Sequence, residues 1–286
     1  MSLAIIADIH GNLPALNAVA ADLAREGVDE VIVDGDMVGR GPMGTAVVHR
    51  IAELGWHCVG GNHEEYLLDF VHRRVPESWW DLEEWACSRW MAAELSADAV
   101  AFIEDLPFSA RRGDIHIVHG TLDSNREGLG SWTSDAVLNT HLDVCGARVL
   151  VCAHTHRAMV RKLGERRVVN VGSVGLPFNG DTRAQYAVFR DGAIELRQVA
   201  YDRDALLDAY TTTGFLEHGG VSATLLAEEV RHARPFLVPF LKWCGVQRIE
   251  PVSDRVDAFL AWHEPFAPLA LLYQKLGLLA QAPETS

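Results

Sequence analysis

The most constraining feature of the sequence is a repeated pattern in which a short apolar run ends in side chains that can bind a metal ion. Apolar runs of this length, bounded by turn residues, are typical of buried strands. The runs are Leu3–Ala7, Glu30–Asp34, Trp56–Val59, Ile115–Val118 and Val149–Cys152. The side chains that follow them, in the same order, are Asp8 with His10, Asp36, Asn62 with His63, His119, and His154 with His156. Because ligands bind beyond the carboxyl ends of strands in α/β sheets, we expect these side chains to converge.

Helical segments between the first runs place the chain in the α/β class. Leu13–Glu26 carries apolar residues at helical spacing, and Gly44–Glu53 predicts a second helix. The alternation of strand and helix predicts βαβ units with parallel strands. Later strands are predicted at Val168–Val171, Tyr186–Phe189 and Ile194–Val199, the last two as a hairpin.

Two other segments differ from this strand-rich part. Residues from about 64 to 105 are predicted to be mostly helical, and we interpret their tryptophans as packing between helices in preference to a pocket wall. After residue 202 the chain is again predicted to be helical, with Pro235 and Pro239 expected to interrupt it. The helices expected there are Asp204–Tyr210, Ala223–His232 and Val256–His263. We therefore predict a domain over residues 1–202 that includes the helical insertion, and an extension over residues 203–286 packed on the same domain.

The types of side chain in the pattern indicate which ions would suit it. Imidazole and carboxylate ligands together suit Mn, Fe, Zn, Co or Ni better than Ca or Mg. A short carboxylate such as Asp36 can bridge two ions, and a two-metal site supports in-line attack on phosphorus. Residues i and i+2 of an extended segment point the same way, so Asp8 and His10 are expected to share a face, as are His154 and His156.

Composition excludes some functions. Thirty-nine acidic and 25 basic residues give a formal net charge of −14, which argues against a protein that neutralises the phosphates of duplex nucleic acid over a wide face. The five cysteines include no Cys-x-x-Cys pair, so buried free thiols are expected. With neither a secretory leader nor an apolar run of membrane length, the sequence predicts a cytoplasmic protein that does not bind membranes.

The motifs resemble those of one known family, the calcineurin-like metallophosphoesterases. The resemblance rests on Asp8-Ile9-His10-Gly11-Asn12, Gly35-Asp36, Gly61-Asn62-His63-Glu64, His119-Gly120 and His154-Thr155-His156, and it extends through the loop Asn170–Gly175. The Asp-Ile-His-Gly-Asn form is similar to the small bacterial and archaeal phosphodiesterase-like branch. The resemblance implies an α/β (α+β) fold, a calcineurin-like β-sandwich flanked by helices in place of a simple doubly wound sheet. A mostly helical C-terminal extension would follow it.

The resemblance also implies a role for each motif residue. Asp8, His10 and His156 would hold one metal ion, Asn62, His119 and His154 would hold the other, and Asp36 would bridge both. His63 would not be a ligand; it would contact the substrate phosphate and assist the leaving group. The implied cofactors are two divalent transition-metal ions, with Mn expected first and Fe, Zn, Ni or Co as alternatives. Their charge would make the site locally positive within an acidic protein.

Arg40 and its neighbour Gly39 need separate interpretation. The segment Gly35–Gly41 resembles a phosphoprotein-phosphatase block in which an arginine grips phosphate, so Arg40 is a candidate for substrate binding and catalysis. A solvated loop arginine is the alternative. Those phosphatases carry an Asp at the position of Gly39 that orients the catalytic histidine, so the group that orients His63 is left unidentified. Val171 is a second departure, because relatives often have Pro there, and it is expected to change loop stiffness.

The implied activity is that of a metal-dependent phosphoric ester hydrolase acting on small phosphoesters, first of all phosphodiesters or nucleotides. A hydroxide bridging the two ions would attack phosphorus, and His63 would protonate the leaving oxygen as general acid. A dinucleoside-polyphosphate hydrolase and a phosphomonoesterase are the enzymatic alternatives. A non-catalytic, metal-dependent interaction module is the alternative from another class. The oligomeric state stays open, with a homodimer as one option.

Overall fold

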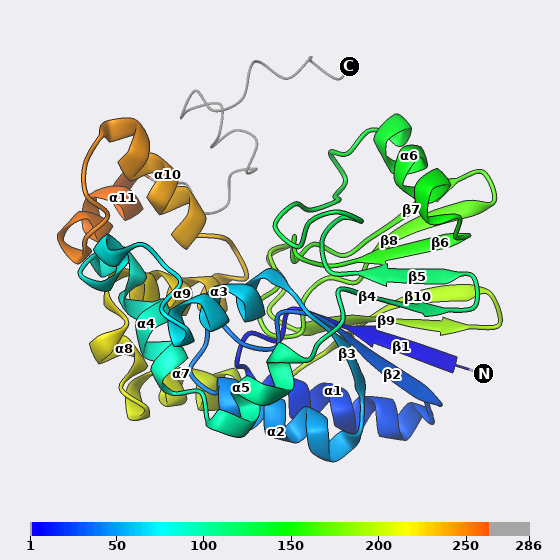
Figure 1. The fold of residues 1–286 in the computed structure, drawn as a ribbon, viewed down its shortest axis with the longest axis horizontal. Helices are drawn as coiled ribbons and strands as arrows, with labels where there is room; N and C mark the ends of the chain where they lie inside the picture. The colour runs from blue at the N-terminus through cyan, green and yellow to red at the C-terminus, as the bar shows by residue number, and fades with distance from the viewer. Residues whose placement is uncertain (1, 263–286) are drawn as a thin grey trace.

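Two β-sheets pack face to face at the centre of the protein, and helices cover their outer faces and one end (Figure 1). The computed structural model describes residues 2–262. The first sheet has the order β10-β9-β1-β2-β3 and the second has the order β4-β5-β6-β8-β7. The strands are β1 (Ser2–Ile6), β2 (Glu30–Asp34), β3 (His57–Val59), β4 (Ser109–Arg112), β5 (Ile115–Val118), β6 (Val149–Cys152), β7 (Met159–Leu163), β8 (Arg166–Asn170), β9 (Ala184–Arg190) and β10 (Ala193–Val199). The predicted α/β (α+β) sandwich flanked by helices is confirmed.

Strand β1 lies in the middle of the first sheet and is covered on both faces. It runs parallel to β2, where Ile5 lies opposite Ile32, and antiparallel to β9, where Ile5 lies opposite Ala187. Ile5 belongs to the core between the two sheets, whereas Ala4 and Ile6 belong to the core shared with the helices. A strand buried on both faces has to be apolar throughout, which explains the continuous apolar run at the start of the sequence.

The second sheet has parallel strands at its centre and antiparallel strands at both edges. Strands β5, β6 and β8 run parallel, while β4 pairs antiparallel with β5 and β7 pairs antiparallel with β8. Neither edge strand was predicted from the sequence. β4 ends in Arg111-Arg112 and β7 contains Arg161-Lys162, so neither has an apolar run. Such charged residues are typical of edge strands, where they discourage pairing with other chains.

Helices α1 and α2 cover the outer face of the first sheet, and α6 covers the outer face of the second. α1 begins after Asn12, whose side chain accepts a hydrogen bond from the Ala15 backbone N–H, and it ends at Gly27. α6, which the sequence analysis missed, is capped by Ser134. The helices are α1 (Leu13–Glu26), α2 (Gly44–Leu54), α3 (Asn62–Val71), η1 (Glu77–Trp80), η2 (Glu83–Trp85), α4 (Ala86–Ala93), α5 (Ala97–Glu104), α6 (Asp135–Cys145), α7 (Arg203–Thr212), α8 (Phe215–His218), α9 (Gly220–His232), α10 (Leu237–Gln247), η3 (Ser253–Arg255) and α11 (Val256–Trp262).

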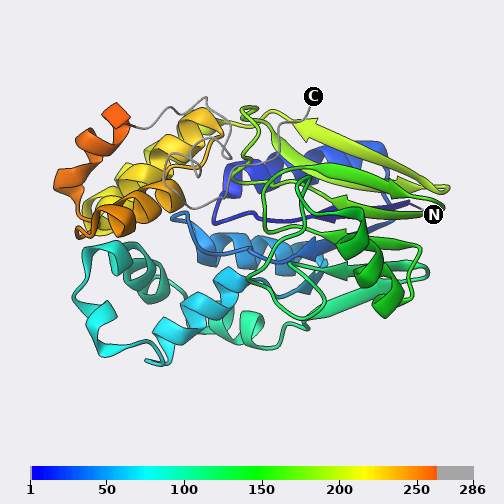
Figure 2. The ribbon, with the colours of Figure 1, turned by 90° about the horizontal axis from the view of Figure 1, so that it is seen from above.

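Helices from two distant parts of the sequence gather at one end of the sandwich (Figure 2). Helices α7 and α9 share one core with α4, to which Met91, Tyr210 and Leu226 contribute. The prediction that Pro239 interrupts a helix is wrong. Pro239 lies in the first turn of α10, where a backbone N–H has no partner within the helix, so no hydrogen bond is lost. The domain boundary at residue 202 stays a prediction. The helix end predicted at His263 lies outside the described residues, as does the rest of the extension to residue 286.

The cysteines and the helix lengths can be compared with what the composition predicted. The five cysteines are free thiols, three of them buried and two partly buried. This agrees with the absence of a Cys-x-x-Cys pair in the sequence. Within residues 2–262, no helix is both long enough and apolar enough to cross a membrane.

Candidate metal centre

The side chains predicted to bind metal come together where β1, β2, β5 and β6 end, next to the start of α3. They form two clusters of potential ligand atoms, each within 4.8 Å of one another. The first cluster is Asp8, His10, Asp36 and His156, and the second cluster is Asp36, His119 and His154. Asp36 belongs to both clusters, as a bridging ligand would have to.

The first cluster is almost completely shielded from solvent. His156 Nε2 lies 3.3 Å from Asp8 Oδ1, and His10 Nε2 lies 3.7 Å from Asp36 Oδ2. The two imidazole nitrogens lie 3.1 Å apart. Two nitrogens and two carboxylates thus face a common point, which is the arrangement that a bound cation requires.

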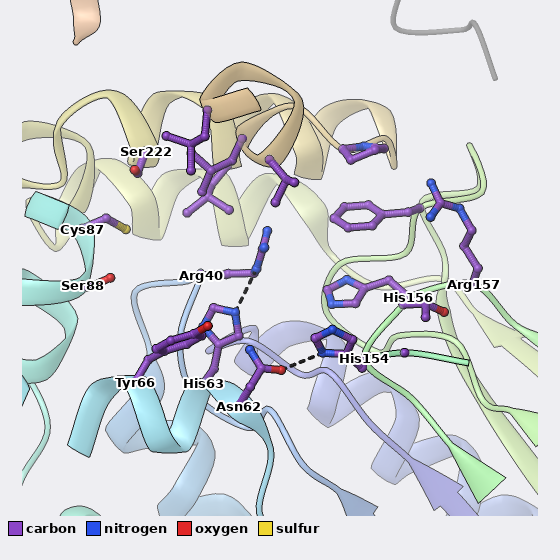
Figure 3. A pocket seen from close by; sticks show the side chains of 18 of the residues that line it. Arg40, Asn62, His63, Tyr66, Cys87, Ser88, His154, His156, Arg157 and Ser222 are labelled. Carbon is purple, nitrogen blue, oxygen red and sulfur yellow. Dashed lines mark hydrogen bonds between the residues drawn. The ribbon is translucent and has the colours of Figure 1, made fainter. Parts of the chain in front are cut away.

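The second cluster lies on the other side of Asp36. His119 Nε2 is 3.3 Å from Asp36 Oδ2. Asn62 Oδ1 lies 3.2 Å from His119 Nε2 and 2.7 Å from His154 Nδ1, so it faces the same point (Figure 3). The structure therefore brings all seven predicted ligands together in two groups that share one carboxylate, and their metal-binding roles stay predictions.

An extended backbone was expected around these side chains, and the structure shows a different one. Asp8, His10, Asp36, His154 and His156 all have φ between 51° and 61°, in the left-handed region. Backbone hydrogen bonds between the loops after β1 and β2 hold this conformation, including one from the His10 N–H to the Asp36 carbonyl (2.9 Å). Left-handed backbone at residues other than glycine is uncommon and clusters at functional sites.

Three of the four clustered histidines are oriented by the protein backbone. Each donates a hydrogen bond from Nδ1 to a main-chain carbonyl, which leaves Nε2 as the atom that faces the cluster. The bonds run from His10 to Val38 (3.3 Å), from His119 to Asp34 (2.8 Å) and from His156 to Leu176 (2.6 Å). His154 differs, because it presents Nδ1 to Asn62.

The residues present fit a pair of divalent transition-metal ions. Both carboxylate oxygens of Asp8 are buried and have no hydrogen-bond partner among the described residues. A buried carboxylate without a partner is costly, and a cation at the first cluster would satisfy it. The full donor set of four imidazoles, two carboxylates and one amide oxygen is of the mixed nitrogen and oxygen type that transition metals prefer.

Burial and mutual charge shift the pKa values of the side chains in the two clusters. Burial lowers the pKa of His10 well below its ordinary value and that of His154 to about 4, so both rings are neutral and free to act as ligands. Burial opposes a charge on Asp36, but His119 and His63 hold the pKa of Asp36 well below its ordinary value. For His119, burial opposes protonation, yet Asp36 raises its pKa. Asp36 and His119 therefore each favour the charged form of the other.

Glu64 was not predicted as a site residue, yet it joins the loops that carry both clusters. Its buried carboxylate accepts hydrogen bonds from the backbone N–H groups of Asp36 (2.8 Å), Met37 (2.7 Å), Val38 (3.1 Å) and Gly61 (2.7 Å). A Cβ at Gly61 would collide with Asp36 Oδ1, so glycine is required before the helix. Burial, followed by the charge of Asp36, raises the pKa of Glu64 to about 7. A glutamate three residues after the helix cap was the available sequence signal.

The loop Asn170–Gly175 supports the end of β1 from the side of the second sheet. The Ser173 hydroxyl donates to the backbone carbonyl of Asp8 (2.8 Å). The departure at Val171 has a physical basis, because its backbone N–H donates to the carbonyl of Cys152 (3.1 Å). Proline has no N–H and would lose this bond.

His63 and Arg40 face each other at the edge of the two clusters (Figure 3). Arg40 Nε donates to His63 Nε2 (3.1 Å), and the His63 backbone N–H donates to Asp36 Oδ1 (2.8 Å). A Cβ at Gly39 would collide with the His63 ring, so an aspartate has no room there. Arg40 Nη1 donates in turn to Glu229 Oε2 (3.1 Å) on α9. The contact to the His63 side chain therefore comes from Arg40, the residue after Gly39. Arg40 in turn is held by Glu229 of the C-terminal helix α9.

A pocket of about 930 Å³ lies against the two clusters. Its floor includes Asn62, His63, His154 and His156, and its other walls come from α4, α9, α10 and the loop after β5 (Figure 3). That loop forms part of the rim through Gly128 and Ser131. Trp79 packs in the core against Trp85, as expected, but Trp85 also lines the pocket.

Comparison with known families agrees with this geometry. The sequence profile of the calcineurin-like phosphoesterase superfamily domain matches residues 1–190, which is well over half of the chain. The chain belongs to the calcineurin-like phosphoesterase superfamily, and the resemblance inferred from the motifs is confirmed. Membership implies divalent metal ions, and the two clusters are a possible site for them.

Individual relatives extend the likeness beyond the matched domain. A crystal structure of a metallophosphoesterase from Sphaerobacter thermophilus has a TM-score of 0.67 at 24% identity and covers 82% of this chain and 100% of that one. The hypothetical protein PH1004 from Pyrococcus horikoshii OT3 has a TM-score of 0.69 at 18% identity and covers 82% of this chain and 99% of that one. The uncharacterized protein MJ0912 of Methanocaldococcus jannaschii is 24% identical over 219 residues, which cover 70% of this chain and 88% of its own. At these identities the structural matches show the fold alone.

Proposed function

We propose that this chain is a metal-dependent phosphodiesterase that hydrolyses small phosphodiesters. The observation that carries the proposal is the pair of clusters that share Asp36 and lie against the pocket, whose floor includes His156 of the first cluster and His154 of the second. Two divalent ions bound there would polarise phosphoryl oxygens and lower the pKa of a bound water. Mn²⁺ is the proposed metal, because the ligand set combines imidazole with carboxylate.

The roles of the chain's own residues follow from where they face. Arg40 presents a guanidinium to the pocket, and its planar fork suits two phosphate oxygens. A bound phosphate can replace His63 as acceptor of the Arg40 Nε–H. Burial lowers the pKa of His63 to about 3, and a phosphate anion beside the ring favours its protonated form. His63 would then hold the proton that the leaving oxygen receives.

The lining of the pocket favours a diester over a polyphosphate. Among the described lining residues, the Lys and Arg side chains are limited to Arg40 and Arg157. Arg40 already bonds the carboxylate of Glu229, and Glu84 adds an acidic residue to the wall. A dinucleoside polyphosphate carries several negative charges along its bridge, and those lying away from the two ions would meet little compensating charge. A monoester would leave most of the volume unused.

A substrate panel tests the proposal. Purified protein loaded with Mn²⁺ is given bis-p-nitrophenyl phosphate, p-nitrophenyl phosphate and diadenosine tetraphosphate, and product release is followed with each. We expect the diester to have the highest kcat/KM and the Asp36→Asn variant to release no product. A higher kcat/KM for the tetraphosphate or the monoester would replace this function with one of those alternatives. Equal rates for wild type and Asp36→Asn would favour a non-catalytic module.

A further inference from the structure

The pocket extends well past the two clusters, and its far side is apolar. We call Trp85, Met91, Leu226, Leu237, Val238 and Leu241 the apolar wall. They come from η2, α4, α9 and the first turns of α10. In Figure 3, Cys87 of α4 and Ser222 of α9 lie on the opposite side of the pocket from His154 and His156. The part of the pocket that would bind a phosphate is therefore continuous with an apolar surface that would not contact the phosphate itself.

The apolar wall is partly open and is not only core packing. Leu237, Val238 and Leu241 each keep part of their surface accessible although they line the pocket. Ser222 also lines the pocket, but its hydroxyl already donates a hydrogen bond to the backbone carbonyl of Glu84 (2.9 Å). Accessible apolar side chains next to a few converging polar groups are the usual composition of a small-molecule site.

We propose that the substrate of this site carries a bulky apolar group, a ring or an alkyl chain of several carbons, on the phosphorus-bound oxygen that faces α9 and α10. This inference rests on the proposed phosphodiesterase function and specifies its substrate class. Each methylene moved from water onto the apolar wall is worth about fourfold in affinity. A phosphodiester whose second ester group is small or charged would not make contact with the apolar wall.

A series of esters with one leaving group tests the substrate class. Methyl, n-butyl and n-octyl p-nitrophenyl phosphates share charge and chemistry and differ only in apolar surface. We expect kcat/KM to rise at least tenfold from the methyl to the octyl ester. Leu241→Ser should lower kcat/KM for the octyl ester about fivefold and leave the methyl ester within twofold. Val246→Ser, on the same helix but 44% exposed and outside the pocket lining, is the matched control and should change neither.

Binding without turnover separates this inference from the proposed function. Calorimetry of the Mn²⁺-loaded protein with methylphosphonate and octylphosphonate should give at least tenfold tighter binding of the longer compound, and Leu241→Ser should remove most of that difference. Turnover with equal kcat/KM along the ester series would overturn the apolar substrate and leave the phosphodiesterase standing. Tighter binding of octylphosphonate with no ester hydrolysed would support the apolar site and overturn the phosphodiesterase. Equal binding of both phosphonates would overturn the inference in either case.

A second, independent observation concerns how the C-terminal helices reach the centre. Glu229 on α9 is completely buried, and its Oε2 accepts the hydrogen bond from Arg40 Nη1 (3.1 Å). Its Oε1 accepts from the backbone N–H groups of Phe236 (2.8 Å) and Leu237 (2.9 Å), so the carboxylate cannot swing away. A chain of hydrogen bonds thus runs from α9 through Arg40 to His63 Nε2.

The backbone of Arg40 is held by the same region. Arg40 has φ of 58°, and its carbonyl accepts a hydrogen bond from the Tyr210 hydroxyl on α7 (3.0 Å). The geometry points to Glu229 as a positioning residue that fixes the Arg40 guanidinium beside His63. Its carboxylate acts on His63 only through Arg40, which donates to His63 Nε2. An arginine without this anchor would lose its orientation, because its long side chain has many rotamers.

A double-mutant cycle tests the positioning role. Glu229→Gln keeps the acceptor for Phe236 and Leu237 but removes the charge that holds Arg40. We expect kcat for bis-p-nitrophenyl phosphate to fall about tenfold, with the metal content unchanged. In an Arg40→Ala background the same change should alter kcat less than twofold, because the group that Glu229 positions is gone. Equal losses in both backgrounds would show a merely structural role and overturn the assignment.

Two further variants keep this test decisive. Glu228→Gln is the matched control, because the neighbouring Glu228 pairs with Arg231 at the surface and should leave kcat unchanged. Tyr210→Phe removes only the hydrogen bond to the Arg40 carbonyl. If Glu229→Gln does not fold, the positioning role predicts a threefold or larger fall in kcat for Tyr210→Phe that disappears with Arg40→Ala. Unchanged kcat in Tyr210→Phe would then count against it.

Discussion

At the scale of single residues, two glycines that both have positive φ serve different purposes. Gly39 has φ of 80° and Gly27 has φ of 60°, so a side chain at either position is strained. A Cβ at Gly27 meets no atom within 4 Å, whereas a Cβ at Gly39 meets the His63 ring. Gly27 therefore only ends a helix, and Gly39 also makes room for the histidine.

Gly39→Ala and Gly27→Ala should separate these purposes. Gly27→Ala should lose roughly 1 kcal/mol of stability, because alanine is unfavourable in the left-handed region. Gly39→Ala should lose more, because its Cβ also collides with His63. Only Gly39→Ala should displace the His63 ring, and we expect its kcat to fall at least tenfold while Gly27→Ala keeps wild-type kcat. Steady-state kinetics and thermal unfolding check both. Full activity in Gly39→Ala would contradict the close packing of His63 on this residue.

His63 itself has no ligand atom in either cluster. We expect His63→Ala to retain the wild-type metal content, measured by inductively coupled plasma mass spectrometry. The rate of diester hydrolysis should fall about 100-fold or more, which is typical for loss of a general acid. If the variant loses metal along with activity, His63 is a ligand and its assignment as proton donor is wrong.

At the scale of elements, the start of α3 organises the site. The helix places Asn62 and His63 at its first turn, and the carboxylate of Glu64 in the same turn holds the loop after β2. One short helical turn thus supplies a predicted ligand, the predicted proton donor and the support of the bridging Asp36. Because these three residues lie in one helical turn, the motif Gly61–Glu64 is contiguous in the sequence.

Glu64→Gln should weaken this organisation. The amide keeps one acceptor oxygen where the carboxylate offers two, so at least one buried N–H loses its partner at a cost of about 1–3 kcal/mol. We expect a lower midpoint of urea unfolding and weaker Mn²⁺ binding. Glu65→Gln is the control, because Glu65 bonds Asn125 and Arg126 on the outer side of the same helix and should affect stability by less than 1 kcal/mol. Unchanged metal affinity in Glu64→Gln would show that the loops hold their shape without it.

At the scale of the whole molecule, part of the excess negative charge lies at the candidate metal centre. The chain has a formal net charge of −14, and two of its carboxylates, Asp8 and Asp36, lie buried at the junction of the two sheets. Both carboxylate oxygens of Asp8 are without a hydrogen-bond partner among the described residues. Divalent ions would relieve this cost at the place where loops from both sheets meet, so metal binding should stabilise the fold as a whole.

Metal removal tests this connection. At a free Mn²⁺ concentration 100 times Kd, binding adds about 2.7 kcal/mol to the free energy of unfolding. We expect Tm to rise by roughly 5 °C or more over the EDTA-treated protein in scanning calorimetry. Asp8→Asn should remove most of this rise, and Mg²⁺ at the same concentration should produce less of it. An identical Tm with Mn²⁺ and EDTA would mean that the clusters hold no ion.

The sequence alone determined the core strands and the metal-ligand pattern, because both depend on local composition and order. Buried strands have to be apolar, and each predicted ligand follows its strand directly, so Asp8, Asp36 and His119 were visible one by one. Edge strands β4 and β7 carried no such signal, because their charged residues face solvent. The contacts of Arg40 were decided only by tertiary structure, since Glu229 lies 189 positions away and looks like any other helical glutamate in the sequence. Its partner is set by how α9 packs against the sandwich, and the apolar wall of the pocket arises from the same packing.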